Sequence, residues 1–112
     1  MINYNNKRFK VVDSSKSEDL TSDMTFHYQQ TGDIVTSTYD GGLVKKGHII
    51  GIVMSDGSLH MRCHHIKWNG EIIIGICQAI PEFMENGKLR LHGKWKWISW
   101  NLSEGNCVLE EL

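Results

Sequence analysis

The sequence predicts an all-β protein, a single-domain up-and-down antiparallel barrel of about eight strands. Short segments rich in β-branched and aromatic residues alternate with glycine-containing turns along the whole chain, and no segment shows a convincing helical pattern. The stretch from Gly47 to Pro81 contains three such segments in immediate succession, which indicates consecutive hairpins. Because the chain has 112 residues, we expect one domain over residues 1–112. Closing the sheet would remove the exposed edges of a flat eight-stranded sheet.

The expected strands follow one another with a turn between each pair. A strand is predicted where apolar, β-branched or aromatic residues alternate with polar ones. The segments that meet this description are Lys7–Asp13, Thr25–Gln30, Ile34–Tyr39, Val44–Met54, two strands between Gly57 and Pro81, Lys88–Trp100 and Cys107–Leu112. Residues 14–24 are polar and lack this alternation, so they predict a surface loop or a single helical turn.

The dipeptides Asp56-Gly57 and Asn69-Gly70 predict two-residue turns of type I′. Such a turn at Asn69-Gly70 pairs Cys63 with Ile76 and Cys77 with Arg62. The two cysteines would then point to opposite faces of the sheet, which argues against a disulfide between them.

The same registers give two faces that are both largely apolar. One is rich in isoleucine, and the other carries Arg62, His64, Gly51, Gly75 and Cys77. An antiparallel sheet normally has one polar face, so the outer face is expected to be covered by a loop or by another subunit. We therefore expect a homo-oligomer.

Pro81 decides which face is inside. With an unbroken strand, the isoleucine-rich face would share the interior with Trp95 and Trp97. Because proline cannot donate to a ladder, it often marks a β-bulge, and a bulge at Pro81 would exchange the faces beyond it. We favour the bulge, which places Arg62 and His64 in the interior with the two tryptophans.

Composition narrows the classes of partner. The formal net charge of −1 predicts no attraction to nucleic acid or to an anionic membrane. The chain begins without a secretory signal pattern and has three cysteines without C-x-x-C spacing, so we expect a cytoplasmic protein with free thiols.

The segments YDGGLVKKGHIIGIV, GSLHMRCHHI, GEIIIGIC, NGKLRLHGKWKW and VLEEL resemble a family of small bacterial avidin-like barrel proteins that are often labelled N-acetylglutamate synthase. The resemblance extends over most of the chain from Phe26 onwards and implies an eight-stranded barrel like those of avidins and lipocalins. The enzyme label is not carried over, because the chain lacks the glycine-rich turn and helix that would hold the pyrophosphate of acetyl-coenzyme A. Biotin binding is not carried over either, because the contacting residues cannot be matched one by one.

Arg62 and His64 form the first candidate ligand-binding pair. Residues i and i+2 of a strand point to the same side, and the neighbouring glycines would leave space for an anion held by the guanidinium. The alternatives are a polar stripe on the surface or an arginine bonded to a buried carboxylate.

Trp95, Trp97 and Tyr39 are the second candidate group, together with Trp100 and Tyr28, as flat apolar walls of a ligand pocket. The alternative is ordinary core packing, because tryptophan is highly buried in any fold.

Metal binding and catalysis have weaker support in the sequence. Cys63 and His65 could supply two metal ligands, but no third is evident, so neither a metal site nor a cofactor is predicted.

The sequence thus predicts a barrel that binds a small ligand, possibly anionic with an apolar or aromatic part. The alternatives are a structural or protein-interaction barrel without ligand, and an enzyme that uses His64 as acid or base at the barrel mouth.

Overall fold

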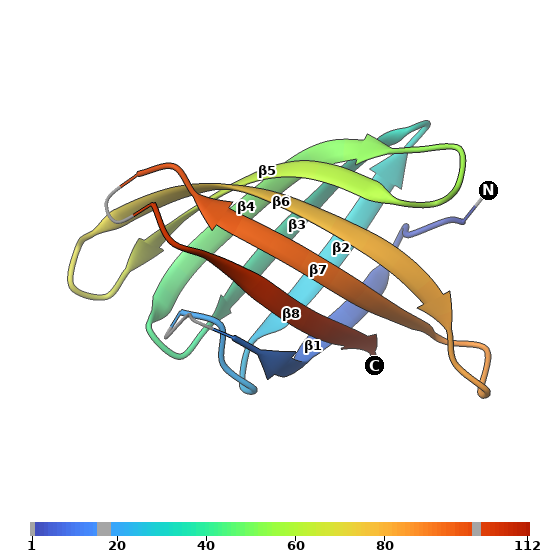
Figure 1. Ribbon diagram of the computed structural model, residues 1–112, viewed down its shortest axis with the longest axis horizontal. Helices are drawn as coiled ribbons and strands as arrows, with labels where there is room; N and C mark the ends of the chain where they lie inside the picture. The colour runs from blue at the N-terminus through green and yellow to red at the C-terminus, as the bar shows by residue number, and fades with distance from the viewer. Residues whose placement is uncertain (1, 16–18, 100–101) are drawn as a thin grey trace.

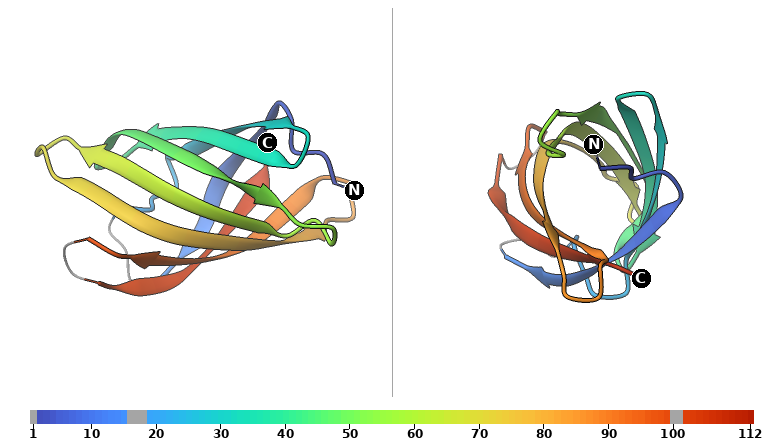
Figure 2. Two further views of the ribbon diagram at one scale, coloured as in Figure 1. Left: turned by 90° about the horizontal axis from the view of Figure 1, so that it is seen from above. Right: turned by 90° about the vertical axis from the view of Figure 1, so that its right-hand side faces the viewer.

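The computed structural model describes residues 2–15, 19–99 and 102–112 and forms a closed eight-stranded antiparallel barrel (Figures 1 and 2). Each strand pairs with its neighbours in sequence, and β1 pairs with β8 to close the ring. The prediction of an all-β up-and-down barrel is therefore confirmed. The strands are β1 (Lys7–Ser14), β2 (Thr25–Thr31), β3 (Ile34–Gly41), β4 (Val44–Val53), β5 (Leu59–Lys67), β6 (Ile72–Phe83), β7 (Leu89–Trp97) and β8 (Glu104–Glu111).

The hairpin turns between β4 and β7 differ from the predicted type. Val53 pairs with Leu59 and Ile66 pairs with Ile72, so each of these turns is one residue longer than a two-residue turn allows. In each, only the glycine has positive φ (+87° at Gly57 and +91° at Gly70), as in a three-residue loop that ends in a glycine bulge. The expected type I′ turns at Asp56-Gly57 and Asn69-Gly70 are therefore wrong.

The side chain before each glycine explains the preference for the longer loop. Oδ1 of Asp56 accepts a hydrogen bond from the backbone N–H of Ser58, and Oδ1 of Asn69 accepts one from Glu71. The β6–β7 turn repeats the arrangement, with Oδ1 of Asn86 accepting from the N–H two residues later. Three hairpins thus use the same side-chain-to-backbone bond to fix the same turn.

The longer turns reverse the side chains of β5, so each of them points to the opposite side of the sheet from the side predicted. Cys63 lies opposite Gly75, and Met61 lies opposite Cys77, not Cys63 opposite Ile76. Because a shift of one residue reverses the direction of every side chain, Met61, Cys63 and His65 face the interior. The expectation that Cys63 and Cys77 point to opposite faces is wrong.

The predicted bulge at Pro81 is absent from the β6–β7 ladder, which keeps one register from Gly75 opposite Trp97 to Phe83 opposite Leu89. The N–H of Met84 points toward β7, so position 81 faces the β5 side by alternation. The β5–β6 ladder ends at Leu59 opposite Ala79, two residues earlier. The backbone nitrogen of Pro81 therefore lies at a position where the sheet needs no hydrogen-bond donor.

The barrel interior is a core of aromatic and aliphatic side chains, including Phe9, Phe26, Tyr28, Leu59 and Leu91. Small residues lie beside the large ones. A Cβ atom on Gly75 would approach the ring of Trp97 to 2.4 Å, and one on Gly47 would approach the ring of Tyr39 to 2.3 Å. These glycines leave the space that the aromatic rings occupy on the inner wall.

Segments outside the strands cover both ends of the barrel. At one end, Tyr4 is fully buried, and its hydroxyl donates a 2.5 Å hydrogen bond to the carbonyl oxygen of Gly57. At the other end, the described part of residues 14–24 lacks a helix, but Asp19 and Met24 are buried. Residues 14–24 are therefore not only a surface loop, because part of the segment packs onto the barrel.

Within the described ranges, the chain contains no helix of the length and apolarity needed to cross a membrane.

Candidate binding site

The barrel encloses a small apolar cavity of about 60 Å³ near the end covered by Asp19–Met24. Side chains from β2 to β8 line it, and Leu20 contributes from the covering segment. Two liquid water molecules occupy roughly this volume. Ligand sites of drug-sized molecules are typically several times larger, at about 300–1,000 Å³. The cavity therefore has room for a ligand of only a few non-hydrogen atoms.

Stacked aromatic rings form the walls of the cavity. Trp95 and Trp97 stack with ring centroids 5.1 Å apart, and Phe26 stacks on Tyr39 at 4.8 Å. These four side chains line the cavity and are at most 6% exposed. The structure thus brings Trp95, Trp97 and Tyr39 together inside the barrel, as the sequence predicts. Trp100, the other tryptophan of the predicted group, lies outside the described residues.

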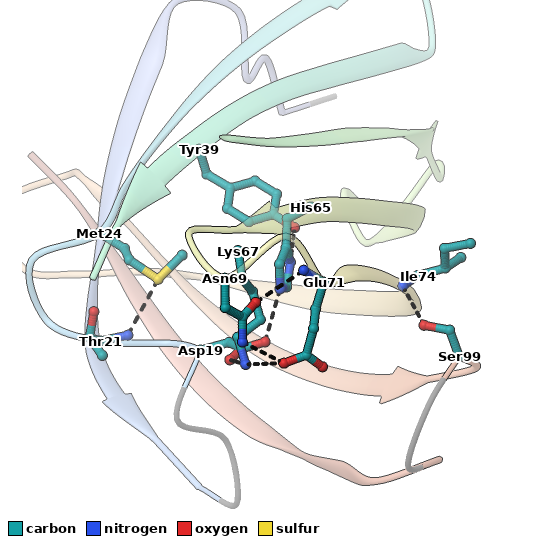
Figure 3. A network of polar contacts seen from close by, with 10 residues as sticks. All are labelled: Asp19, Thr21, Met24, Tyr39, His65, Lys67, Asn69, Glu71, Ile74 and Ser99. Atoms are coloured by element: carbon teal, nitrogen blue, oxygen red, sulfur yellow. Dashed lines mark hydrogen bonds and ion pairs between the residues drawn. The ribbon is translucent and has the colours of Figure 1, made fainter. Parts of the chain in front are cut away.

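A chain of polar contacts connects the aromatic wall to the covering segment (Figure 3). The Tyr39 hydroxyl lies 2.8 Å from Nδ1 of His65, and Nε2 of His65 lies 2.9 Å from Oδ2 of Asp19. Nζ of Lys67 lies 3.4 Å from the other carboxylate oxygen of Asp19. His65 and Lys67 thus join β5 to the segment that covers the barrel end.

The protonation states of this chain follow from its surroundings. The hydrogen bond from His65 lowers the pKa of Asp19 despite burial, and Lys67 also favours the carboxylate. Burial raises the pKa of Tyr39 far above its ordinary value, so the phenol keeps its proton. We therefore assign Tyr39 as donor to Nδ1 and His65 as the Nε2–H tautomer that donates to Asp19.

Trp95 leaves a polar group unused next to the cavity. Its side chain is 4% exposed, and its indole Nε1–H has no hydrogen-bond acceptor among the residues that the structure describes. Most buried donors in native proteins have a partner, and an exception calls for an explanation such as a ligand or an ordered water molecule.

The structure does not place Arg62 and His64 at the cavity. Both are exposed on the outer face of β5, where His64 pairs with His48 and Arg62 pairs with Ile50. The prediction that they project into the interior is wrong, because the longer turns reverse β5. His64 therefore does not lie at a barrel mouth, where the enzyme alternative had placed it.

Sequence reasoning missed the residues that occupy the interior in their place. Met61, Cys63 and His65 alternate with Arg62 and His64, so only the register of β5 distinguishes the two sets. An aspartate or asparagine followed by glycine carries a signal, because this pair also suits the three-residue loop. The sequence does not single out Asp19, because nothing in its polar segment predicts that this carboxylate is buried beside a histidine.

The fold and cavity define an eight-stranded up-and-down barrel with an enclosed apolar site, the architecture of small-ligand carriers. The family described as "Avidin-like protein" matches residues 2–112, so the chain belongs to the avidin-like family. No curated protein and no solved structure matches the chain.

Proposed function

We propose that the protein binds a small, neutral, largely apolar molecule in the barrel cavity, with a hydrogen-bond acceptor directed at Trp95 Nε1. Trp95 carries this proposal, because it lines the cavity and its buried indole donor has no partner among the described residues. Membership of the avidin-like family supports an interior site in general. A hydrogen bond in this apolar setting would add affinity and orient the ligand.

The lining argues against the anionic ligand that the sequence suggested. Arg62 is outside the barrel, and the Lys94 side chain is exposed on the outer face. An anion would lose its hydration without gaining a partner of opposite charge inside, which is strongly unfavourable. The proposed ligand is therefore uncharged.

A cavity-filling variant tests the proposal. Ala79 lines the cavity, and Ala79→Leu should fill most of the free volume, whereas His60→Leu adds the same side chain on the outer face of β5. The probes are acetonitrile, which has an acceptor, and propyne, which has the same shape without a nitrogen acceptor, because both are small enough for the cavity. Binding is followed by ligand-observed NMR.

We expect acetonitrile to bind more tightly than propyne to the wild type and to His60→Leu, and neither to bind to Ala79→Leu. Equal binding by all three proteins would place the probe elsewhere and refute the proposal. Absence of binding to the wild type at millimolar concentration would also refute it.

A second candidate function, self-association, rests on the outer face of the barrel. The isoleucine face consists of Ile34, Ile50, Ile52, Ile66, Ile72 and Ile74 on β3–β6, each 43–62% exposed. Ile34 lies opposite Ile52, and Ile66 lies opposite Ile72, so the side chains are direct cross-strand neighbours. Exposed apolar side chains gathered on one side of a protein favour an interaction surface, and here His60, Arg62 and His64 of β5 lie between the isoleucines of β4 and those of β6. We propose that a second copy of the chain covers this face.

Light scattering at micromolar concentration tests the self-association. The double variant Ile50→Lys and Ile74→Lys should be monomeric. Val12→Lys, which changes an exposed apolar residue on β1, should retain the oligomer. A monomeric wild type would refute this second function without affecting the cavity.

A further inference from the structure

Three free cysteines converge on the cavity from different strands. Cys63 (β5), Cys77 (β6) and Cys107 (β8) all line it. Cys63 lies opposite Gly75, two residues before Cys77 on β6, so the two thiols are diagonal neighbours across the two strands. Met61, which also lines the cavity, lies directly opposite Cys77 in the ladder. Two thiols and a thioether therefore share one side of the barrel interior.

The chemistry of these donors selects the kind of ion that could bind. The described residues that line the cavity include no histidine, aspartate or glutamate. Zinc in structural sites takes four nitrogen or sulfur ligands. The described part of the chain has no cluster of three or more histidine, cysteine or acidic residues able to hold a metal. Thiolate and thioether ligands instead favour soft ions such as Cu(I).

We propose that Cys63 and Cys77, with the thioether of Met61, bind one soft monovalent ion of the Cu(I) class inside the barrel. The inference rests on the proposed function in that the ion uses the same cavity. A space of about 60 Å³ is small for an organic ligand but ample for one ion. The ion would thus be a second class of ligand for the same cavity.

The binding step balances without an external oxidant or reductant. The S–H bond of Cys63 breaks, a bond between sulfur and the ion forms, and one proton leaves to solvent. The negative charge of the thiolate then neutralises the positive charge of the ion, which suits an apolar site.

The test titrates the reduced full-length protein with Cu(I) under anaerobic conditions, in competition with bicinchoninate, a coloured Cu(I) chelator. We expect one ion per chain, release of about one proton, and quenching of tryptophan fluorescence. Zn(II) in the same assay should not bind in this stoichiometric manner.

Serine variants identify the ligands. Cys63→Ser and Cys77→Ser should each lower the affinity more than about 100-fold, because loss of an outer-shell partner alone costs about 10- to 100-fold. Met61→Leu should lower it less. Cys107→Ser, the matched control in the same cavity, should stay within about threefold of the wild type, the usual scatter of such contributions.

Retained affinity in both Cys63→Ser and Cys77→Ser would overturn the inference, as would loss of binding in Cys107→Ser alone. If a variant fails to fold, X-ray absorption of the Cu(I)-loaded wild type decides. A first shell of two or three sulfur atoms supports the site, and a nitrogen or oxygen shell refutes it. Acetonitrile binding without Cu(I) binding would refute only this inference, whereas absence of both would refute the proposed function as well.

Discussion

The hydroxyl of Tyr39 lies 2.8 Å from Nδ1 of His65, and this hydrogen bond joins the aromatic wall of the cavity to the covering segment. His65 passes the connection on through Nε2 to Asp19, which lies 46 residues earlier in the chain. All three side chains are buried, so each depends on the others for its hydrogen bonds. The covering of this barrel end is therefore sensitive to changes in any one of them.

Removal of the Asp19 carboxylate should weaken the fold. Asp19→Ala leaves the buried Nε2–H of His65 without its acceptor, at a cost of about 1–3 kcal/mol in the free energy of unfolding. Urea unfolding at pH 7 measures this loss. Asp33→Asn, which changes an exposed carboxylate in the β2–β3 turn, is the control and should unfold like the wild type.

The same carboxylate predicts an acid dependence. The pKa of Asp19 is lower in the folded protein than its ordinary value of 3.8, so its stabilisation is present above that pH and is lost as the pH falls further, through the folded pKa. The unfolding free energy of the wild type should therefore drop below about pH 4 more steeply than that of Asp19→Asn. Parallel curves for the two proteins would show that the bond to His65 does not depend on the carboxylate charge.

Tyr4 predicts an alkaline dependence at the opposite barrel end. Burial raises the pKa of Tyr4 to about 12 from 10.0, so its contribution is complete below pH 10 and is lost as the pH rises through about 12. Tyr4→Phe should have a flatter curve above pH 10. At pH 7 it should lose about 1–3 kcal/mol, because the carbonyl of Gly57 loses its buried donor. Unchanged stability at pH 7 would mean that water replaces the hydroxyl.

Gly75 and Gly70 should respond differently to the same substitution. The Cβ of Gly75→Ala would overlap the ring of Trp97, so the variant should lose about 1–3 kcal/mol and shift tryptophan emission. Gly70→Ala meets no neighbouring atom but strains a backbone with φ +91°, at about 1–2 kcal/mol. Its emission should match the wild type. Equal emission in both variants would contradict the close contact between Gly75 and Trp97.

Trp95→Phe should separate ligand binding from stability. The Nε1–H has no acceptor among the described residues, so its removal costs no hydrogen bond within them. A bound acceptor would lose one, and acetonitrile affinity should fall about 3- to 10-fold while propyne affinity is unchanged. Trp68→Phe, at an exposed turn position, should alter neither. An equal loss for both probes would assign Trp95 a purely apolar role.

The sequence predicts the order and number of strands well, because each strand has its own alternating pattern and glycine turn. It predicts the faces poorly, since an error of one residue in a turn reverses the next strand. The error at Asp56-Gly57 reversed β5, and the equal error at Asn69-Gly70 restored β6. The supposed bulge at Pro81 compensated for a third such error at Asn86-Gly87.

The register of each strand also decided which candidate site residues lie inside the barrel. Trp95 and Trp97 lie inside the barrel because the error at Asn86-Gly87 and the supposed bulge at Pro81 cancelled, and a role of these residues and Tyr39 in binding stays a prediction. Arg62 and His64 were chosen in error because β5 alone was reversed. The contact of Asp19 with His65 joins positions 46 residues apart, and no local pattern encodes it.

The rate at which a ligand exchanges between solvent and the cavity depends on the two coverings of the barrel. These are Tyr4 at one end and residues 19–24 at the other. A ligand can enter or leave the interior only as fast as one of these coverings moves aside, whatever its contacts within. The entry rate would then level off at high ligand concentration, and loosening either covering would speed entry and release together. Residence time in this barrel is thus set by residues that need not touch the ligand.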